Sequence, residues 1–155
     1  RLFTQLMQVS GRAGRAQVAG QVLIQTEFPD HPLYHALQRQ EYDALAQTIL
    51  SERRMAGFPP YVYQALLRAE ARQIDSALAF LTRAANINKK ENDIEIFDPV
   101  PAQMMRLKNL ERAQLLIQSS SRKILQKFLY DWHKKLNKIA VRGVRWTIDV
   151  DPIEF

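Results

Sequence analysis

The first part of the chain carries apolar residues in helical and in extended patterns. Apolar side chains spaced three and four residues apart predict a helix over residues 1–8, and the continuous apolar run Val22-Leu23-Ile24 predicts a buried strand. The proline-containing stretch 28–32 predicts a turn. From Arg39 to Arg54 the apolar positions fit one face of an amphipathic helix, which Gly57-Phe58-Pro59-Pro60 ends. We therefore expect a boundary that separates residues 1–60 from residues 61–155.

Beyond Tyr61, strand-like and helix-like patterns alternate. The predicted elements are a strand over 62–71, a helix over 75–86, a short strand at 94–96 closed by Pro99 and Pro101, a hairpin joining 103–107 to 114–118, a long helix capped by Ser121, and a strand over 144–150. This βαββαβ order favours helices packed on one face of a mostly antiparallel sheet. The aromatic residues at core periodicity, which we expect in the core, are Phe80, Phe97, Phe128, Trp132 and Trp146.

Composition narrows the classes of protein that fit. With 155 residues and 46% hydrophobic side chains, the chain can bury a core. Its apolar runs are far shorter than the roughly 20 residues that cross a bilayer. The absence of cysteine excludes disulfides and cysteine-ligated metals, and three scattered histidines do not restore a metal site. We expect a soluble, cytoplasmic protein without a bound metal in this chain.

The positive charge is concentrated in one region. The net charge is +6, and residues 106–145 hold 11 basic and 2 acidic side chains. Clustered lysines and arginines are typical of a nucleic-acid contact surface, and also of the solvated face of a helix. We expect DNA contacts from Arg106, Lys108, Arg112, Lys127, Lys134 and Lys135, with Arg142 and Arg145 beside them.

One short motif carries residues suited to phosphate chemistry. Residues 8–15 read Gln-x-x-Gly-Arg-x-x-Arg, with the arginines at Arg12 and Arg15. Arginines three apart on a helical turn point to the same side, where guanidinium groups can stabilise charge on a transferring phosphoryl group. Gln8 could orient the phosphate or a water molecule, and Gly11 would let the backbone come close.

This motif resembles motif VI of superfamily 2 helicases, which lies on the second RecA-like lobe. Over nearly its whole length the chain is similar to the primosomal protein N′ (PriA) family of bacterial replication-restart DNA helicases. The other matching stretches are Ile24-Gln25-Thr26 with Pro29 and His31-Pro32, Glu52-Arg53-Arg54 with Gly57–Tyr61, Pro99–Ala102, Leu115–Gln118 before Ser121-Arg122, and Asp149–Glu154. Departures from the family lie at Asp98-Pro99 and around Asn109-Leu110.

The resemblance implies a C-terminal fragment: the tail of helicase lobe 2 (α/β), followed by an α+β domain similar to ribosomal protein S10. The complete protein would be an ATP-dependent 3′→5′ DNA helicase that recognises stalled forks and starts primosome assembly. It would use ATP with Mg, and zinc held by cysteines that this chain lacks. Arg12 and Arg15 would be catalytic, and Gln8 and Gly11 would bind nucleotide with them. The implied partners are forked and single-stranded DNA, other primosome proteins, and single-stranded DNA-binding protein (SSB), whose acidic tail Arg122 would bind.

Other readings stay open from the residues alone. A stand-alone S10-like or RRM-like nucleic-acid-binding module is the alternative, although the predicted strands lack the aromatic signature of RRM stacking. Asp149 and Asp151 share one face of a strand, a spacing that could bind a metal. Because no histidine or further carboxylate lies nearby in sequence, we expect a structural cap or a salt link to Arg142 or Arg145 instead. His133 is expected to be a surface residue.

Overall fold

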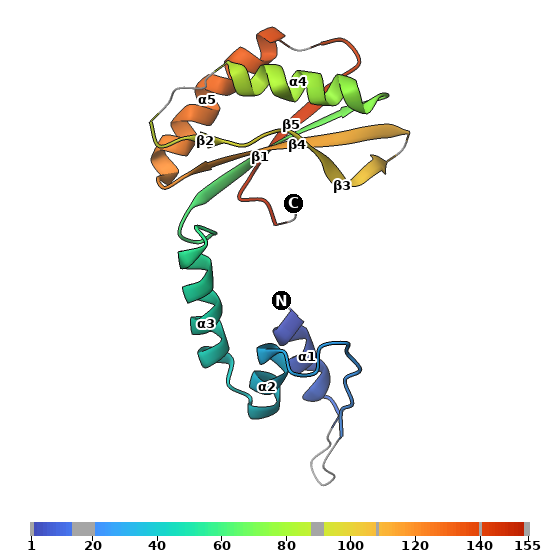
Figure 1. Ribbon diagram of the computed structural model, residues 1–155, viewed down its shortest axis with the longest axis vertical. Helices are drawn as coiled ribbons and strands as arrows, with labels where there is room; N and C mark the ends of the chain where they lie inside the picture. The colour runs from blue at the N-terminus through green and yellow to red at the C-terminus, as the bar shows by residue number, and fades with distance from the viewer. Residues whose placement is uncertain (1, 14–20, 88–91, 108, 140, 154–155) are drawn as a thin grey trace. The chain divides into compact units, whose positions relative to one another are not determined.

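The computed structural model describes residues 2–13, 21–87, 92–107, 109–139 and 141–153. Its internal contacts divide the chain into two compact units, residues 1–56 and 57–155. We call them the N-terminal and the C-terminal unit and describe each by itself (Figure 1).

The described part of the N-terminal unit consists of helices and irregular segments. Helix α1 spans Leu2–Ser10, α2 spans Pro32–Arg39 and α3 spans Tyr42–Met55. Its small core is formed by buried side chains from the three helices: Phe3, Ala36, Leu37 and Leu45. The helix predicted for residues 1–8 is confirmed by α1.

Two expectations for this unit are wrong. Residues 22–24 form no strand, and Leu23 is 95% exposed, because no strand in the described part of this unit offers a ladder for them to join. The helix expected from Arg39 begins at Tyr42. A separate helix precedes it and ends at Arg39, and its C-cap residue Gln40 has a left-handed φ of 57°.

The start of α2 is encoded in residues that the sequence patterns predict to be a turn. Pro32 occupies the first turn of the helix, where its missing N–H costs nothing. The Nδ1 atom of His31 accepts a hydrogen bond of 3.1 Å from the Leu33 N–H, so the histidine caps the helix. A proline after a capping side chain therefore marks a helix start here.

The C-terminal unit is an antiparallel sheet with two helices on one of its faces (Figure 1). Its elements are β1 (Tyr63–Ala71), α4 (Ile74–Asn86), β2 (Glu95–Ile96), β3 (Val100–Leu107), β4 (Leu110–Ser119), α5 (Arg122–Ile139) and β5 (Arg145–Val150). The strand order is β2-β4-β1-β5, and β3 also pairs with β4. The predicted antiparallel sheet and its two helices are confirmed.

The edge of the sheet next to β4 is interrupted. β2 pairs with Ile117 and Gln118, and β3 pairs with the earlier part of the same strand. The two strands therefore act as consecutive pieces of one edge. All five stretches expected to be extended form strands, which is one strand more than the order βαββαβ counts. Pro101 lies inside β3 rather than closing the preceding strand, and it is tolerated because β3 pairs on one side with β4 alone.

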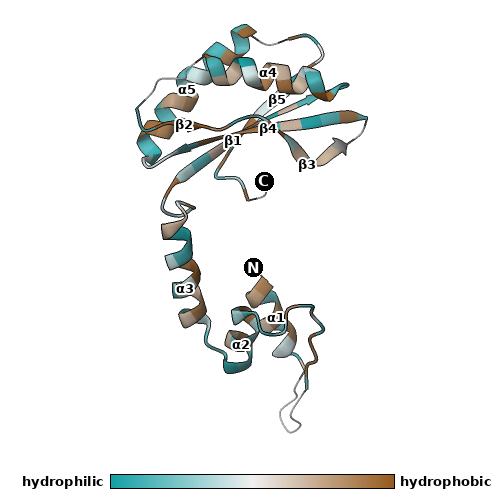
Figure 2. Cartoon of the chain, in the orientation of Figure 1, coloured by the Kyte–Doolittle hydropathy of each residue, from teal (hydrophilic) through white to brown (hydrophobic). Residues whose placement is uncertain are grey.

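Alternate residues of the central strands face the two helices and form the core. Ala65, Leu67 and Ala69 of β1 pack with Leu115 and Ile117 of β4. The helices contribute the buried side chains Ala77, Phe80, Leu81, Ala84, Leu125, Phe128, Leu129, Trp132 and Leu136. Hydrophobic and hydrophilic residues both occur along α4 and α5 in Figure 2, as expected for amphipathic helices.

The aromatic residues expected in the core do not all reach it. Phe80, Phe128 and Trp132 are fully buried, whereas Trp146 is partly buried and Phe97 is 38% exposed. The Trp146 ring lies 6.3 Å from that of Phe80 and 5.3 Å from that of His133. His133 is exposed, as expected, but it also covers one side of Trp146.

Candidate functional site

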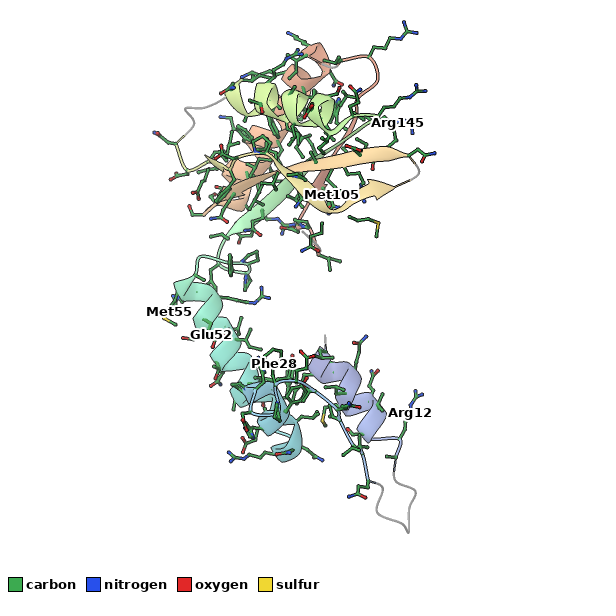
Figure 3. The ribbon with its side chains drawn as sticks, turned by 45° about the vertical axis from the view of Figure 1, so that its right-hand side comes forward. Arg12, Phe28, Glu52, Met55, Met105 and Arg145 are labelled. Atoms are coloured by element: carbon green, nitrogen blue, oxygen red, sulfur yellow. The ribbon has the colours of Figure 1, made fainter. Side chains whose placement is uncertain are left out.

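The residues of the motif VI resemblance lie at the end of α1. Gln8 is an exposed residue of the helix, and Arg12 lies one turn later, where its N–H donates to the Val9 carbonyl at 3.1 Å. Gln8 and Arg12 line a shallow depression of about 310 Å³ together with Gln5 and Val9. Figure 3 labels Arg12 at this end of the helix. The structure therefore brings Gln8 and Arg12 together; Arg15 lies outside the described residues.

Gly11 stands where a side chain would be crowded. Its N–H donates to the Met7 carbonyl at 2.9 Å, which continues the hydrogen bonding of the helix into the turn. A Cβ atom at Gly11 would lie 3.3 Å from that carbonyl oxygen, closer than ordinary van der Waals contact. A glycine thus keeps the turn before Arg12 tight.

The expected DNA contacts on α5 share one exposed side of that helix. Lys127, Lys134 and Lys135 are exposed, and the opposite side of the helix packs into the core. The Nζ atom of Lys134 lies 3.9 Å from the centre of the Tyr130 ring, a cation–π contact that orients the ammonium group. α5 therefore presents a basic, solvent-facing surface, which we call the α5 lysine face (Lys127, Lys134 and Lys135).

The expected contacts from the β3–β4 hairpin are not all beside this face. The Nε atom of Arg112 pairs with Glu70 Oε1 at 3.0 Å, on the face of the sheet opposite the helices, because Glu70 and Arg112 alternate with residues that point into the core. Arg106 lies in β3 opposite Glu111 in the backbone register, and Lys108 lies outside the described residues. The expected single basic surface is thus divided: Arg112 is separated from the α5 lysine face by the sheet and is neutralised by Glu70.

Arg122 is the first residue of α5. It is exposed, and its Nη2 atom lies 3.8 Å from Asp151 Oδ2. Ser121 caps the helix, as expected, by accepting the Ile124 N–H at 3.4 Å. Arg122 therefore meets an internal carboxylate at the place where the resemblance puts the SSB tail.

The two aspartates near the C-terminus do not pair with the arginines expected from the sequence. Asp149 accepts a hydrogen bond of 3.0 Å from Arg68, and Asp151 lies near Arg122. The cause is strand register: Asp149 stands opposite Leu66 on β1 and diagonal to Arg68, on the face away from the helices. The expected links to Arg142 and Arg145 are wrong.

A basic groove lies beside the first turns of α4. It has a volume of about 730 Å³ and is lined by four arginines, Arg72, Arg83, Arg142 and Arg145. The sequence pattern does not indicate Arg72 and Arg83, because each is isolated along the chain and joins the others only when β1, α4 and the α5–β5 turn fold together. We call this feature the arginine groove.

Two structural features were searched for among the residues that the structure describes: a group of metal-binding side chains and a helix that could span a membrane. Within its described ranges, the chain brings together no group of three or more histidine, aspartate or glutamate residues that could hold a metal ion. Of the helices described, none combines the length and apolar character needed to span a membrane.

Comparison with known proteins agrees with the resemblance to the PriA family. The replication restart protein PriA of Haemophilus influenzae is 39% identical over 155 residues, that of Synechocystis is 34% identical over 156, and that of Bacillus subtilis is 30% identical over 155. These alignments cover 97–98% of this chain and 18–21% of the relatives, so the chain spans about a fifth of their length. The family model of the primosomal protein N C-terminal domain matches residues 54–153. The chain therefore belongs to the PriA family of replication restart proteins and represents a C-terminal portion of such a protein.

Proposed function

We propose that this chain is the C-terminal part of an ATP-dependent 3′→5′ DNA helicase that recognises stalled forks and initiates primosome assembly and replication restart. The observation that carries the proposal is the alignment with PriA proteins over 97–98% of the chain. Under this proposal the N-terminal unit is the tail of the second RecA-like lobe, and the C-terminal unit is an S10-like domain that binds DNA and protein partners.

The N-terminal unit would contribute to a nucleotide site without completing one. Gln8 and Arg12 lie together on an exposed depression, as residues that reach toward a phosphate must. Arginine is suited to this role because its guanidinium group is permanently charged and can donate two parallel hydrogen bonds. Arg12 and Arg15 would stabilise charge on the phosphoryl group, while the parts that hold ATP with Mg, and the zinc-binding cysteines, would lie elsewhere in the complete protein.

We expect the isolated chain to hydrolyse no ATP. It has no Gly-x-x-x-x-Gly-Lys-Ser/Thr loop to cradle the phosphates, and arginines without that loop have no bound nucleotide to act on. The measurement is phosphate release with and without single-stranded DNA. Release above the level of a matched Arg12→Ala sample would contradict the proposed division of roles.

The C-terminal unit would bind DNA through its basic surface. We expect the isolated chain to bind single-stranded and forked DNA with an affinity that falls steeply between about 50 and 200 mM salt, because each neutralised phosphate releases condensed counterions. Three contacts to a single strand would give a slope of about −2 in log K against log salt. Fluorescence anisotropy at several salt concentrations measures this slope; the absence of binding, or binding independent of salt, would contradict DNA contact by this chain.

Arg122 would hold the acidic tail of SSB. It is exposed at the start of α5, where the helix terminus also favours negative charge. Asp151 lies 3.8 Å from Arg122, so a tail carboxylate would replace an internal one. An exposed ion pair of this kind contributes little to stability, so replacing Asp151 by a tail carboxylate costs little free energy.

A further inference from the structure

The arginine groove carries a high positive charge, and the carboxylates next to it are already engaged: Glu70, opposite Arg145 in the β1–β5 register, pairs with Arg112, and Glu111 accepts the Ile74 N–H. Its described lining contains the polar residues Gln73 and Ser76 but no aspartate or glutamate. Arg72, Arg142 and Arg145 are exposed, and within the described structure none of the three forms an ion pair or a side-chain hydrogen bond. Arg83 differs, because its Nη2 atom donates to the Ile139 carbonyl at 3.1 Å and so holds the end of α5. Three arginines are therefore available to a ligand.

The backbone fixes where these arginines stand. Arg72 directly follows β1, and the turn after α5 carries Arg142 and leads into Arg145 at the start of β5. That turn is closed by a hydrogen bond of 3.1 Å from the Val144 N–H to the Val141 carbonyl, and Gly143 has the positive φ of 91° that it requires. Arg145 projects outward from this end of the sheet in Figure 3. The groove is thus built by segments held in register by the sheet.

The attraction of the groove for anions comes from side chains rather than from the terminus of α4. The first N–H of that helix, at Ile74, already donates to Glu111 Oε2 at 2.9 Å. Glu111 belongs to β4, so a carboxylate of the protein itself compensates the positive end of the helix dipole. Among the described groups that line the groove, the positive charge available to an anion is therefore that of the arginines.

We propose that the arginine groove binds consecutive phosphates of single-stranded DNA, a proposal that rests on the DNA-binding function proposed above. A single carboxylate engages one guanidinium group, whereas a chain of phosphates can engage several arginines at once. The volume of about 730 Å³ lies within the roughly 300–1,000 Å³ range of small-ligand pockets, so the groove has room for a short stretch of single strand. Other lining residues, among them Ala71, Ala79 and Val144, are apolar, so the arginines are the main polar groups of the groove.

The test removes two groove charges that form no ion pair in the described structure. We expect the double variant Arg72→Gln/Arg145→Gln to bind a fluorescent oligothymidylate of about 12 nucleotides about tenfold more weakly at about 50 mM salt. Its salt slope should be less steep by about 1.4, because each single-strand phosphate contact contributes about 0.7. The pair Arg72→Lys/Arg145→Lys should keep the slope of the unaltered chain, since the charge is retained.

The matched control is Arg39→Gln/Arg53→Gln, which removes the same charge from exposed positions of the N-terminal unit. If this control pair weakened DNA binding as much as the groove variant does, the effect would come from net charge, and the proposed role of the groove would be wrong. If the unaltered chain binds DNA and the groove variant binds it with the same affinity, the proposed role of the groove is wrong, but the proposed DNA-binding function stands. If no form of the chain binds DNA, both proposals are wrong. Displacement of the oligonucleotide by oligoglutamate from the unaltered chain, and not from the groove variant, would assign the groove to an acidic peptide instead. Unchanged circular dichroism of each variant shows that the fold is retained.

Discussion

Replacing Trp132 with alanine is expected to lower the free energy of unfolding of the C-terminal unit by about 3–5 kcal/mol. Trp132 is fully buried, and its ring lies 5.4 Å from that of Phe128 on the same helix. Its Nε1–H donates to the Ala84 carbonyl at 3.1 Å, which connects α5 to α4. The substitution therefore leaves a cavity between sheet and helices and removes a buried hydrogen bond. Urea unfolding followed by far-UV circular dichroism measures the loss.

Two further variants separate the causes of that loss. Trp132→Phe keeps an aromatic ring but removes the donor, so it should cost less than alanine, about 1–3 kcal/mol. Gln126→Ala changes an exposed residue of α5 and should stay within about 0.5 kcal/mol of the unaltered chain. A loss below about 1 kcal/mol for Trp132→Ala would mean that this side chain does not organise the core.

The C-terminal unit is the part of the fold that sequence periodicity predicts well. The apolar stripe of α5 leads to Leu125, Phe128, Trp132 and Leu136, which are all buried. The pattern is informative because one side of the helix meets the core and the other meets solvent, so hydrophobicity and burial coincide. The same contrast locates β1, α4 and β5 to within a residue or two.

The N-terminal unit shows where the same reasoning fails. Several of its apolar side chains, such as Leu23, Phe28 and Met55, are exposed in the described structure. Where apolar side chains are exposed, an apolar run does not predict a buried strand. This is why the prediction of a buried strand at residues 22–24 is wrong. Tyr42, Ile49 and Leu50 fit the expected face of α3, yet of that helix only Leu45 is buried.

The candidate sites divide in a similar way. Gln8 and Arg12 are four residues apart, and the hydrogen bonds of Gly11 and Arg12 continue the helical turn that brings them together; the predicted pairing of Arg12 with Arg15 lies outside the described residues. The pairing of Arg68 with Asp149 joins residues 81 positions apart and depends on the register between β1 and β5. The arginine groove likewise needs three segments to meet. Sequence spacing carries no information on such contacts, because register is set by turns and core packing.

Reversing the charge at two positions of the α5 lysine face, Lys134→Glu/Lys135→Glu, is expected to weaken DNA binding on the order of 100-fold at about 50 mM salt. Both side chains are exposed on the side of the helix away from the core. Each substitution removes an attraction to phosphate and adds a repulsion, and both effects are greatest when little salt screens them. Anisotropy titrations with a single-stranded oligonucleotide at two salt concentrations measure the change.

The fold should withstand this reversal, which makes the binding result informative. Lysine and glutamate have similar helix propensities, and the exposed cation–π pair that Lys134 forms with Tyr130 contributes only about 0.5–1 kcal/mol. The control Arg39→Glu/Arg53→Glu changes the net charge equally at exposed positions of the N-terminal unit. If both double variants lost affinity to the same extent, long-range charge would explain the effect. Loss confined to the α5 variant means that these lysines lie against the phosphates, because screening by salt limits electrostatic attraction to about 10 Å at 0.1 M.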